Sequence, residues 1–278
     1  MFDFNYCDFD IGEHEEWFIR KAWTPKEYRD MLFLSQQEVN ALGWVASFLE
    51  NHDQPRGASL FIPEEDYGFY SLSALATIIF CERGLPFLYQ GQEIGMSNRQ
   101  WKYDEFNDLE TINQYQIALK AGMSKEQALE IVRHHSRDNA RTPMQWSSEE
   151  NAGFSKGKPW MPVNENYKVV NVAEEEKEYG SILNFYKRLI AFYKSEEYNE
   201  ILTYGDFRPI YEKEDHIFAY SRSYGCQKLV LICNFSSKEK DIELSEDYEN
   251  VIFVNYEQTT VIGNTLKMKP YECVIYEM

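Results

Sequence analysis

The spacing of hydrophobic residues changes along this chain, from short apolar runs and helical stripes before about residue 200 to alternation with a period of two after it. Residues 45–49 form an apolar run without a helical stripe, which is typical of a short strand buried on both faces. Residues 86–89 predict a second short strand. Residues 1–10 alternate aromatic with polar side chains, and we expect them to form a strand that runs into a loop.

Helical patterns lie between and after these strands. Thr24, which a proline follows, is typical of the N-cap of a helix, and we expect this helix to continue until Gly43 stops it. Residues 70–83 predict a mostly buried helix that Gly84 ends, and residues 181–194 predict a helix with one apolar face. Strands and helices therefore alternate as in a parallel α/β fold.

Short strands at hairpin spacing follow in the last part of the chain. They are residues 208–211, 216–221, 228–235, 241–244, 251–254 and 272–276. Strands of this length and spacing predict an antiparallel β-sandwich. We expect the domain boundary at 197–202, with an α/β domain over residues 1–196 and a C-terminal β-sandwich over residues 197–278.

Residues 98–178 are too long for a simple connection, and long insertions of this kind are usually functional or disordered. The stretch 104–111 leads into a helix, and a second helix is expected from Ser124 to Arg133. The rest is rich in Trp, Arg, Pro and Gly and has no repeat. We therefore expect an ordered segment, called the lid segment below, that closes over a pocket.

The net charge of the chain limits the kinds of molecule that we expect it to bind. The chain has 278 residues with 46 acidic and 28 basic side chains, for a formal net charge of −18. Such a surface disfavours nucleic acid and anionic membranes and suits a protein that handles neutral molecules. The sequence has no apolar run of membrane-spanning length, and residues 1–5 lack the basic and apolar regions of a signal peptide. We expect a soluble, cytoplasmic protein.

Cysteine and histidine positions do not predict a metal centre. The five cysteines are scattered, and Cys81, Cys233 and Cys273 lie in apolar surroundings typical of small buried side chains in a reducing compartment. His134 and His135 are neighbours, but adjacent residues on a helix point to different faces, so we do not expect them to share an ion. The sequence predicts neither a metal ligand nor a cofactor.

A dense polar cluster, Glu50-Asn51-His52-Asp53-Gln54-Pro55-Arg56, follows the first buried strand without a break. Parallel α/β barrels carry their chemistry at this end of their strands. Each residue by itself also has a structural explanation: Asp53 could cap the next segment, His52 could be a core histidine, and Arg56 could be a solvated loop charge. The succession of these residues favours a functional site instead.

The sequence Asn-His-Asp-Gln-Pro-Arg after Phe-Leu-Glu resembles the fourth conserved region of the α-amylase family of glycoside hydrolases, in its oligo-1,6-glucosidase and α-glucosidase branch. Residues 85–96, 108–111, 137–146 and 151–155 resemble the same branch in the same order. The resemblance implies a (β/α)8 TIM barrel, of which this chain would contain about strands 6–8, followed by an antiparallel β-sandwich. The expected fold class is therefore α/β plus all-β.

The resemblance also implies roles for individual residues. Enzymes of this kind are retaining glycosidases, in which an Asp nucleophile and a Glu acid/base flank the bond about 5 to 5.5 Å apart. Asp53 matches a third carboxylate that stabilises the transition state, and His52 would bind the same sugar. Arg137 would lie beside the nucleophile, and Glu110 would reach the substrate from the lid segment. Structural roles are expected for the other charged residues of these motifs: Arg56, Glu93 and Arg141.

No stretch of the chain matches the nucleophile motif or the acid/base motif of the family. We therefore expect a C-terminal part of an enzyme acting on oligosaccharides, inactive alone and completed by an N-terminal half. The alternatives are a non-catalytic sugar-binding or scaffold relative, a trehalose-6-phosphate hydrolase and a sucrose-processing relative. The presence of His52, Asp53 and Arg137 together disfavours a scaffold, and Glu50 before Asn51 weakly favours the oligo-glucosidase branch.

Overall fold

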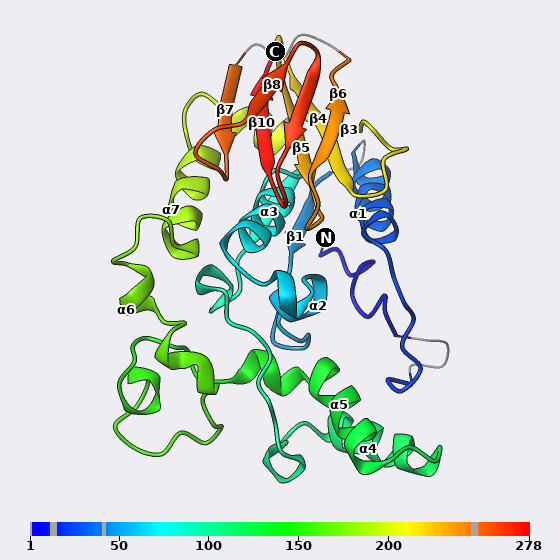
Figure 1. The fold of residues 1–278 in the computed structure, drawn as a ribbon, viewed down its shortest axis with the longest axis vertical. Coiled ribbons are helices and arrows are strands. Elements are labelled where there is room, and N and C mark those ends of the chain that lie inside the picture. The colour runs from blue at the N-terminus through cyan, green and yellow to red at the C-terminus, as the bar shows by residue number, and fades with distance from the viewer. Residues whose placement is uncertain (1, 12–15, 41–42, 246–249) are drawn as a thin grey trace.

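The computed structural model describes residues 2–11, 16–40, 43–245 and 250–278, and Figure 1 shows its elements along the longest axis of the molecule. The first part of the chain contains two strands and the helices around them: α1 (Pro25–Val39), β1 (Val45–Phe48), α2 (Gly57–Phe61), η2 (Glu64–Asp66), α3 (Phe69–Phe80), β2 (Gly84–Phe87) and η3 (Gln92–Ile94). β1 and β2 pair in parallel, with Val45 opposite Gly84 and Phe48 opposite Phe87. The two predicted parallel strands are confirmed, and α3 lies between them in the sequence.

Some predicted boundaries near these strands are wrong. Residues 2–10 turn back on themselves, and only Phe2 forms a parallel bridge to Ala46, so the segment is not a strand. α1 ends at Val39, and the end predicted just before Gly43 falls on residues 41–42, outside the described part of the chain. α3 ends before Gly84, which belongs to β2. A side chain at Gly84 would overlap the carbonyl of the paired strand, so this glycine serves the strand contact rather than the helix end.

The lid segment is ordered, as predicted, and lies at the end of the molecule opposite the C-terminal strands (Figure 1). Its elements are η4 (Tyr103–Glu105), α4 (Leu109–Lys120), α5 (Lys125–His135), η5 (Arg137–Arg141), η6 (Glu150–Gly153), η7 (Glu165–Lys168) and α6 (Val172–Glu175). Its helices share a small hydrophobic core: Trp17, Trp101, Phe106, Tyr115, Ala118, Ala128, Val132 and Met161. Its role as a lid stays a prediction.

The C-terminal part is a sandwich of two antiparallel sheets, as predicted. After α7 (Ile182–Tyr193) and α8 (Asn199–Tyr204) come β3 (Asp206–Pro209), β4 (Ile217–Tyr224), β5 (Gln227–Asn234), β6 (Lys240–Glu243), β7 (Asn250–Val254), β8 (Thr260–Ile262), β9 (Thr265–Met268) and β10 (Cys273–Glu277). The sheets have the strand orders β3-β4-β5-β10-β7 and β6-β9-β8. The hairpin of β8 and β9 was not predicted, because β8 is short and exposed throughout.

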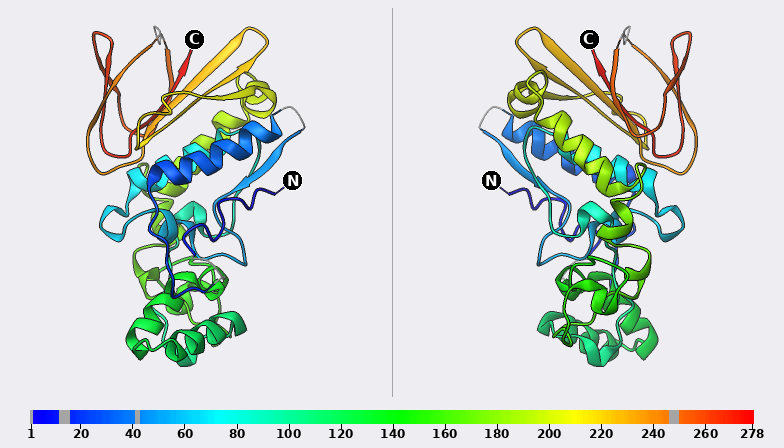
Figure 2. Two further views of the ribbon diagram at one scale, coloured as in Figure 1. Left: turned by 90° about the vertical axis from the view of Figure 1, so that its right-hand side faces the viewer. Right: turned by 90° about the vertical axis from the view of Figure 1, so that its left-hand side faces the viewer.

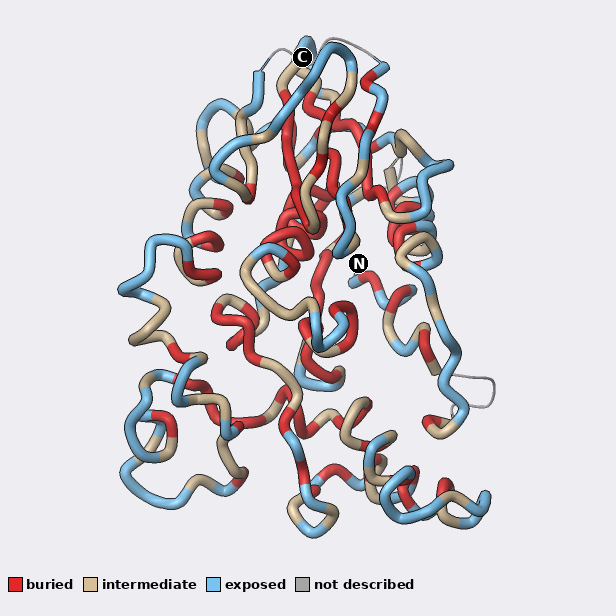
Figure 3. The backbone as a smooth tube through the Cα atoms, viewed as in Figure 1, coloured by how far each residue is buried: buried red, intermediate tan, exposed pale blue. Residues whose placement is uncertain are grey.

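The five-stranded sheet is buried on both faces. One face meets the three-stranded sheet through a cluster of apolar residues: Ile217, Ala219, Val230, Ile232, Ile242, Leu244, Leu266, Met268, Val274 and Tyr276. The other face shares one core with α1, α3 and α7 through a second set: Phe218, Tyr220, Leu229, Leu231, Cys233, Cys273 and Ile275. Figure 2 shows these helices between the sandwich and β1, and Figure 3 shows buried backbone concentrated there. Within the described residues, no helix has the length and apolar character needed to cross a membrane.

Arg222 joins the sandwich to the helical layer. It is 2% exposed, and it donates to the carbonyl of Cys81 at 2.7 Å and to that of Gly205 at 2.9 and 3.2 Å. Burial lowers the pKa of Arg222 to about 10, which leaves it charged at neutral pH. Its guanidinium therefore supplies hydrogen-bond donors to buried carbonyl groups that water cannot reach.

We expect Arg222→Met to lower the free energy of unfolding by about 2–4 kcal/mol, because two buried carbonyl groups lose their donors. Arg208→Met is the matched control on the neighbouring strand β3, where the side chain is exposed, and it should change stability by less than about 0.5 kcal/mol. Urea unfolding followed by circular dichroism measures both. Equal effects of the two substitutions would contradict this role of Arg222.

Candidate active site

The polar residues after β1 form a turn at the surface. The backbone N–H of Asp53 donates to Asn51 Oδ1 at 2.7 Å, and Pro55 cannot continue the strand ladder. The side chains of His52 and Asp53 are 73% and 50% exposed, with His52 Nε2 3.1 Å from Asp53 Oδ2. Both are therefore accessible to a ligand, as the sequence predicted for a site beyond the strand end.

Two arginines of η5, in the lid segment, approach Asp53. Arg141 Nη2 lies 2.7 Å from Asp53 Oδ1, and Arg141 Nε donates to the carbonyl of His52 at 2.8 Å. Arg137 Nη1 lies 3.9 Å from the same carboxylate oxygen. These contacts agree with the structural role expected for Arg141, because its guanidinium joins η5 to the turn that carries Asp53. Nothing in the local sequence signals this contact, since the two residues are 88 positions apart.

Asp108 holds Arg137 in place, and sequence reasoning missed this carboxylate. Asp108 Oδ1 accepts from Arg137 Nε at 3.1 Å and from Nη2 at 2.5 Å. Its other oxygen caps α4 by accepting from the N–H and hydroxyl of Thr111. Burial raises the pKa of Asp108, but the hydrogen bonds from Arg137 and Thr111 outweigh burial and leave the pKa below its usual value. The hydrogen bond that Arg137 donates to Asp108 in turn raises the pKa of Arg137. Both partners are charged at neutral pH, and Arg137 has a fixed orientation.

Glu110 lies in the first turn of α4, and it is partly exposed. Its Oε1 accepts from Gln114 Nε2 at 2.9 Å. Its charge also contributes to the raised pKa of Arg137. The structure thus brings His52, Asp53 and Arg137 together, and Glu110 follows two positions after Asp108, the carboxylate that holds Arg137.

Arg56 lies beneath the site and connects three segments. It is fully buried, and it donates to the carbonyls of Gln90 at 2.7 Å, Asn139 at 3.2 Å and Ala140 at 3.4 Å. These acceptors belong to the loop after β2 and to η5, whereas Arg56 follows β1. Its Nη1 also lies 3.6 Å from Glu50 Oε2. These contacts agree with the structural role expected for Arg56.

The loop after β2 approaches Arg56 closely. Gly91 has a φ of 91°, and a Cβ there would lie 3.0 Å from Arg56 Nη1 and would overlap Met96. Only glycine fits both the backbone angle and the space. Glu93 Oε2 accepts from the N–H of Gly91 at 2.7 Å, which agrees with the bracing role expected for this carboxylate.

A second polar cluster lies at the end of α5, and it corrects the premise that the side chains of His134 and His135 point to different places. Both Nε2 atoms approach the buried Oδ2 of Asp10, at 3.5 and 3.7 Å. The two side chains can converge because neighbours on a helix are separated by about 100° rather than opposed, and because long imidazole side chains at the last residues of a helix can lean the same way. The expectation that they share no ion stays a prediction. Burial lowers the pKa of His135 to about 3, so this imidazole is neutral at physiological pH.

Family models match almost the whole chain. Residues 1–205 match the α-amylase catalytic domain, and residues 217–275 match the C-terminal domain of the α-amylase SusG. The chain belongs to the α-amylase family, which confirms the resemblance found in the sequence.

Individual relatives give the same family. The oligo-1,6-glucosidase of Bacillus cereus is 37% identical over 284 residues, which cover 100% of this chain and 50% of that protein. The trehalose-6-phosphate hydrolase of Escherichia coli is 31% identical over 98% of this chain and 49% of its own length. A solved structure of Bacillus licheniformis trehalose-6-phosphate hydrolase superposes with a TM-score of 0.91 at 36% identity, over 99% of this chain and 50% of that one. The chain therefore spans about half the length of the relatives it matches.

Glu50 predicts a pH dependence of stability. Burial raises its pKa from 4.5 to about 7, even though Arg56 and the N–H of Gly57 act in the opposite direction. Because the folded state holds this proton more tightly than the unfolded state, the contribution is present below about pH 4.5 and is lost as the pH rises through about 7.

Relative to Glu50→Gln, which cannot titrate, the wild-type chain should therefore lose up to about 3 kcal/mol of stability between about pH 5 and about pH 8. Urea unfolding of both chains at several pH values measures the difference. Parallel pH profiles for the two chains would show that Glu50 does not hold a proton in the folded state.

Proposed function

We propose that this chain is the C-terminal part of a retaining α-glucosidase that removes terminal glucose from short oligosaccharides, with α-1,6 bonds as the preferred linkage. The observation that carries the proposal is the half-exposed carboxylate of Asp53 beyond the end of β1, next to His52 and faced by Arg137 and Arg141. Membership of the α-amylase family supports the reaction class. The preference for α-1,6 bonds rests on relatives named oligo-1,6-glucosidase and glucan 1,6-alpha-glucosidase.

In this proposal Asp53 acts as the transition-state stabiliser. Its ionised carboxylate accepts hydrogen bonds from hydroxyl groups of the terminal glucose, and these bonds strengthen as the ring gains oxocarbenium character. Interactions that strengthen in this way accelerate the reaction, whereas equally strong ground-state contacts would only tighten binding. His52 donates to a hydroxyl of the same sugar, and it is exposed enough to do so.

Arg137 and Glu110 contribute from the lid segment. Arg137 is oriented by Asp108, and its remaining N–H groups face the Asp53 side, where the nucleophile of the assembled enzyme would lie. A guanidinium beside a carboxylate favours the charged form, which a nucleophile needs. Glu110 would accept from a substrate hydroxyl at the rim of the site. Arg141 holds Asp53 and the backbone of His52 in register with the lid segment.

The nucleophile Asp and the acid/base Glu would come from an N-terminal half of the enzyme, so the chain alone should be inactive. The exposed aromatic and apolar residues around β1 and β2 support such a partner: Phe2, Phe4, Leu85 and Phe87 are between 46% and 59% exposed. Phe2 and Phe87 have ring centroids 4.9 Å apart, so they form one patch. A parallel pair with an open edge and an apolar face is the surface that further barrel strands cover.

The finer fold assignment belongs to the same proposal. Under it, β1 and β2 are the seventh and eighth strands of a (β/α)8 barrel, and the backbone at Phe2 takes the place of the sixth through its bridge to Ala46. Residues 1–196 then form the last part of the barrel with the lid segment, and residues 197–278 form the β-sandwich domain. The protein would work in the cytoplasm, in keeping with five free cysteines, of which three are buried.

A second candidate substrate is trehalose 6-phosphate. It is favoured by the close superposition on a trehalose-6-phosphate hydrolase, with a TM-score of 0.91. Both substrates would place their terminal glucose in the same position, and they differ in the leaving group. A substrate panel therefore separates them without changing the role of Asp53.

The proposal is tested by measuring hydrolysis of 4-nitrophenyl α-glucoside, isomaltose, maltose and trehalose 6-phosphate. The chain is assayed alone and after co-production with the N-terminal half of the Bacillus cereus oligo-1,6-glucosidase, the part this chain does not span. Activity confined to the mixture, highest on isomaltose, is the expected result. A well-folded complex without activity on any of these sugars would move the assignment to a sugar-binding or scaffold protein.

In the assembled enzyme, Asp53→Asn should lower kcat/KM at least about 100-fold, because the amide keeps the shape but loses the charge that faces the developing cation. The melting temperature should change little, since half of the Asp53 side chain is exposed. Asp104→Asn, at an exposed position of the lid segment, is the matched control and should retain full activity. Loss of folding rather than of turnover in Asp53→Asn would make Asp53 a structural residue.

A further inference from the structure

The cluster of Asp10, His134 and His135 lies outside the proposed active site and has no part in its chemistry. The carboxylate of Asp10 is fully buried, His135 is almost fully buried, and His134 is one fifth exposed. Within the described residues, Asp10 Oδ1 and His135 Nε2 are buried and have no hydrogen-bond partner. Unpaired buried polar atoms are costly, so their position in one cluster calls for a ligand.

The three side chains have the donor set and the spacing of a metal centre. Two imidazole nitrogens and one carboxylate oxygen suit zinc and similar divalent ions. Donor atoms about 2.0–2.1 Å from a tetrahedral ion lie about 3.3 Å from one another. Asp10 Oδ2 lies 3.5 Å from His134 Nε2 and 3.7 Å from His135 Nε2, so these two distances exceed that spacing by only a few tenths of an ångström. Suitable ligand atoms of all three residues lie within 4.8 Å of one another.

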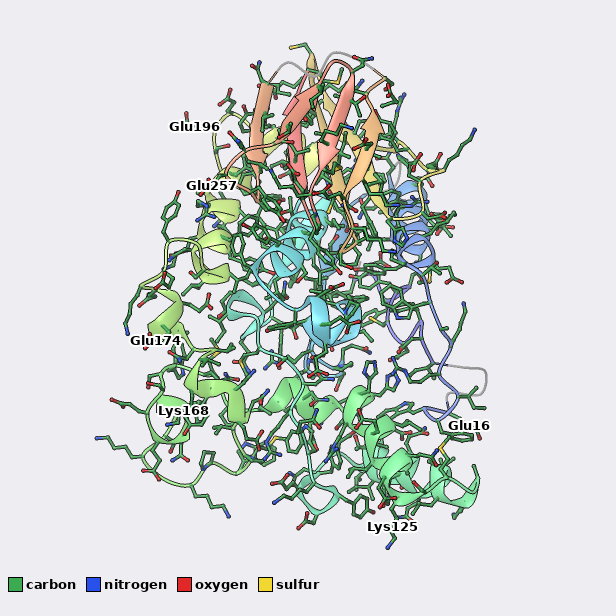
Figure 4. The ribbon with its side chains drawn as sticks, viewed as in Figure 1. Glu16, Lys125, Lys168, Glu174, Glu196 and Glu257 are labelled. Atoms are coloured by element: carbon green, nitrogen blue, oxygen red, sulfur yellow. The ribbon has the colours of Figure 1, made fainter. Side chains whose placement is uncertain are left out.

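We propose that Asp10, His134 and His135 bind a divalent transition-metal ion of the zinc type. The ion would join the segment around Asp10 to the end of α5, two parts of the chain that are more than 120 positions apart. The neighbouring Trp17 already packs in the core of the lid helices, and its backbone N–H donates to Gln114 Oε1 of α4 at 3.2 Å. Figure 4 shows Glu16 beside these helices, above the labelled start of α5 at Lys125. The metal would therefore strengthen an existing contact.

Arg20 occupies part of this space and is the competitor of the ion. Its Nη2 lies 3.4 Å from Asp10 Oδ2 and 3.1 Å from His134 Nε2. A guanidinium cannot remain there beside a dication, but the Arg20 side chain is 45% exposed and can move into solvent. Arg20 and His134 also line an open cleft of about 900 Å³, which gives an ion access to the cluster.

The test is a Co²⁺ titration of the 278-residue chain, followed by visible absorption, with Zn²⁺ competition to obtain affinities. We expect one site per chain that Zn²⁺ displaces. His134→Gln and His135→Gln should each weaken binding at least about tenfold, and the double variant at least about 100-fold. His216→Gln, in the sandwich, is the matched control and should bind as wild type does. Cys226→Ser, which removes the exposed thiol, should also leave binding unchanged.

Arg20→Gln separates the metal site from a plain ion pair. If the cluster binds metal, this variant should bind Co²⁺ several-fold more tightly than wild type, because a positive charge next to the ion is gone. Zn²⁺ should also raise the melting temperature of wild type and not that of the double histidine variant. Equal Co²⁺ affinity of wild type and the double variant would overturn the proposal, as would an Arg20→Gln chain that loses stability without gaining affinity.

Discussion

The buried guanidinium of Arg56 is the contact on which the arrangement of the site depends. A charge removed from water needs partners for its N–H groups, and Arg56 finds them in backbone carbonyls of Gln90, Asn139 and Ala140. These carbonyls lie in the loop after β2 and in η5, so one side chain fixes the relative positions of the β1 loop, the β2 loop and η5. The exposed residues of the site lie on the same β1 loop, where Arg141 contacts Asp53 and the backbone of His52.

Pairs of carboxylate and guanidinium groups connect the exposed residues of the site to the lid segment. Asp53 pairs with Arg141, and Arg137 pairs with Asp108, which is also the cap of α4. The lid helix and the polar turn after β1 therefore share one network of carboxylates and guanidinium groups. Under the proposed function, a site held in this way is preorganised before a sugar arrives, which is the condition for electrostatic stabilisation of a transition state. His52 and Asp53 are the more exposed groups of this network, and the proposal assigns them to the substrate.

The sandwich supports the same site from the opposite side. Its five-stranded sheet covers the helical layer, and Tyr220 and Arg222 donate to the carbonyls of Ile78 and Cys81 at the end of α3. Because α3 lies between β1 and β2 in the sequence, these bonds help to fix the spacing of the two parallel strands. The C-terminal domain thus supports the candidate site through the helices.

The elements that were predicted correctly are those whose conformation depends on their own local sequence. The buried run at Val45–Phe48, the capped helix after Thr24 and the alternating strands of the sandwich each carry their own periodicity, and all are present. The segment from Phe2 to Asp10 also alternates, but it turns instead, and its rings pack against Phe48 and Phe87. Here tertiary packing overrides a pattern that fits a strand equally well.

The residues of the site were predicted from a motif, whereas their contacts were not. His52, Asp53 and Arg137 stand out because the motif names them, yet the pairing of Asp53 with Arg141 joins positions 88 apart. The convergence of His134 and His135 on Asp10 is equally non-local, and it depends on where α5 ends. No spacing rule within a segment contains such information, because it arises only when separate loops are packed together.

The most direct test of the account is a crystal structure of the chain assembled with its N-terminal half and bound to 1-deoxynojirimycin, a mimic of the glucose ring. The account predicts the inhibitor beyond the end of β1, with the carboxylate oxygens of Asp53 about 2.6–2.9 Å from its hydroxyl groups and His52 donating to one of them. An inhibitor bound elsewhere, with Asp53 keeping only the contacts with His52, Arg137 and Arg141 that it has in the free chain, would contradict the assignment of this turn as the active site.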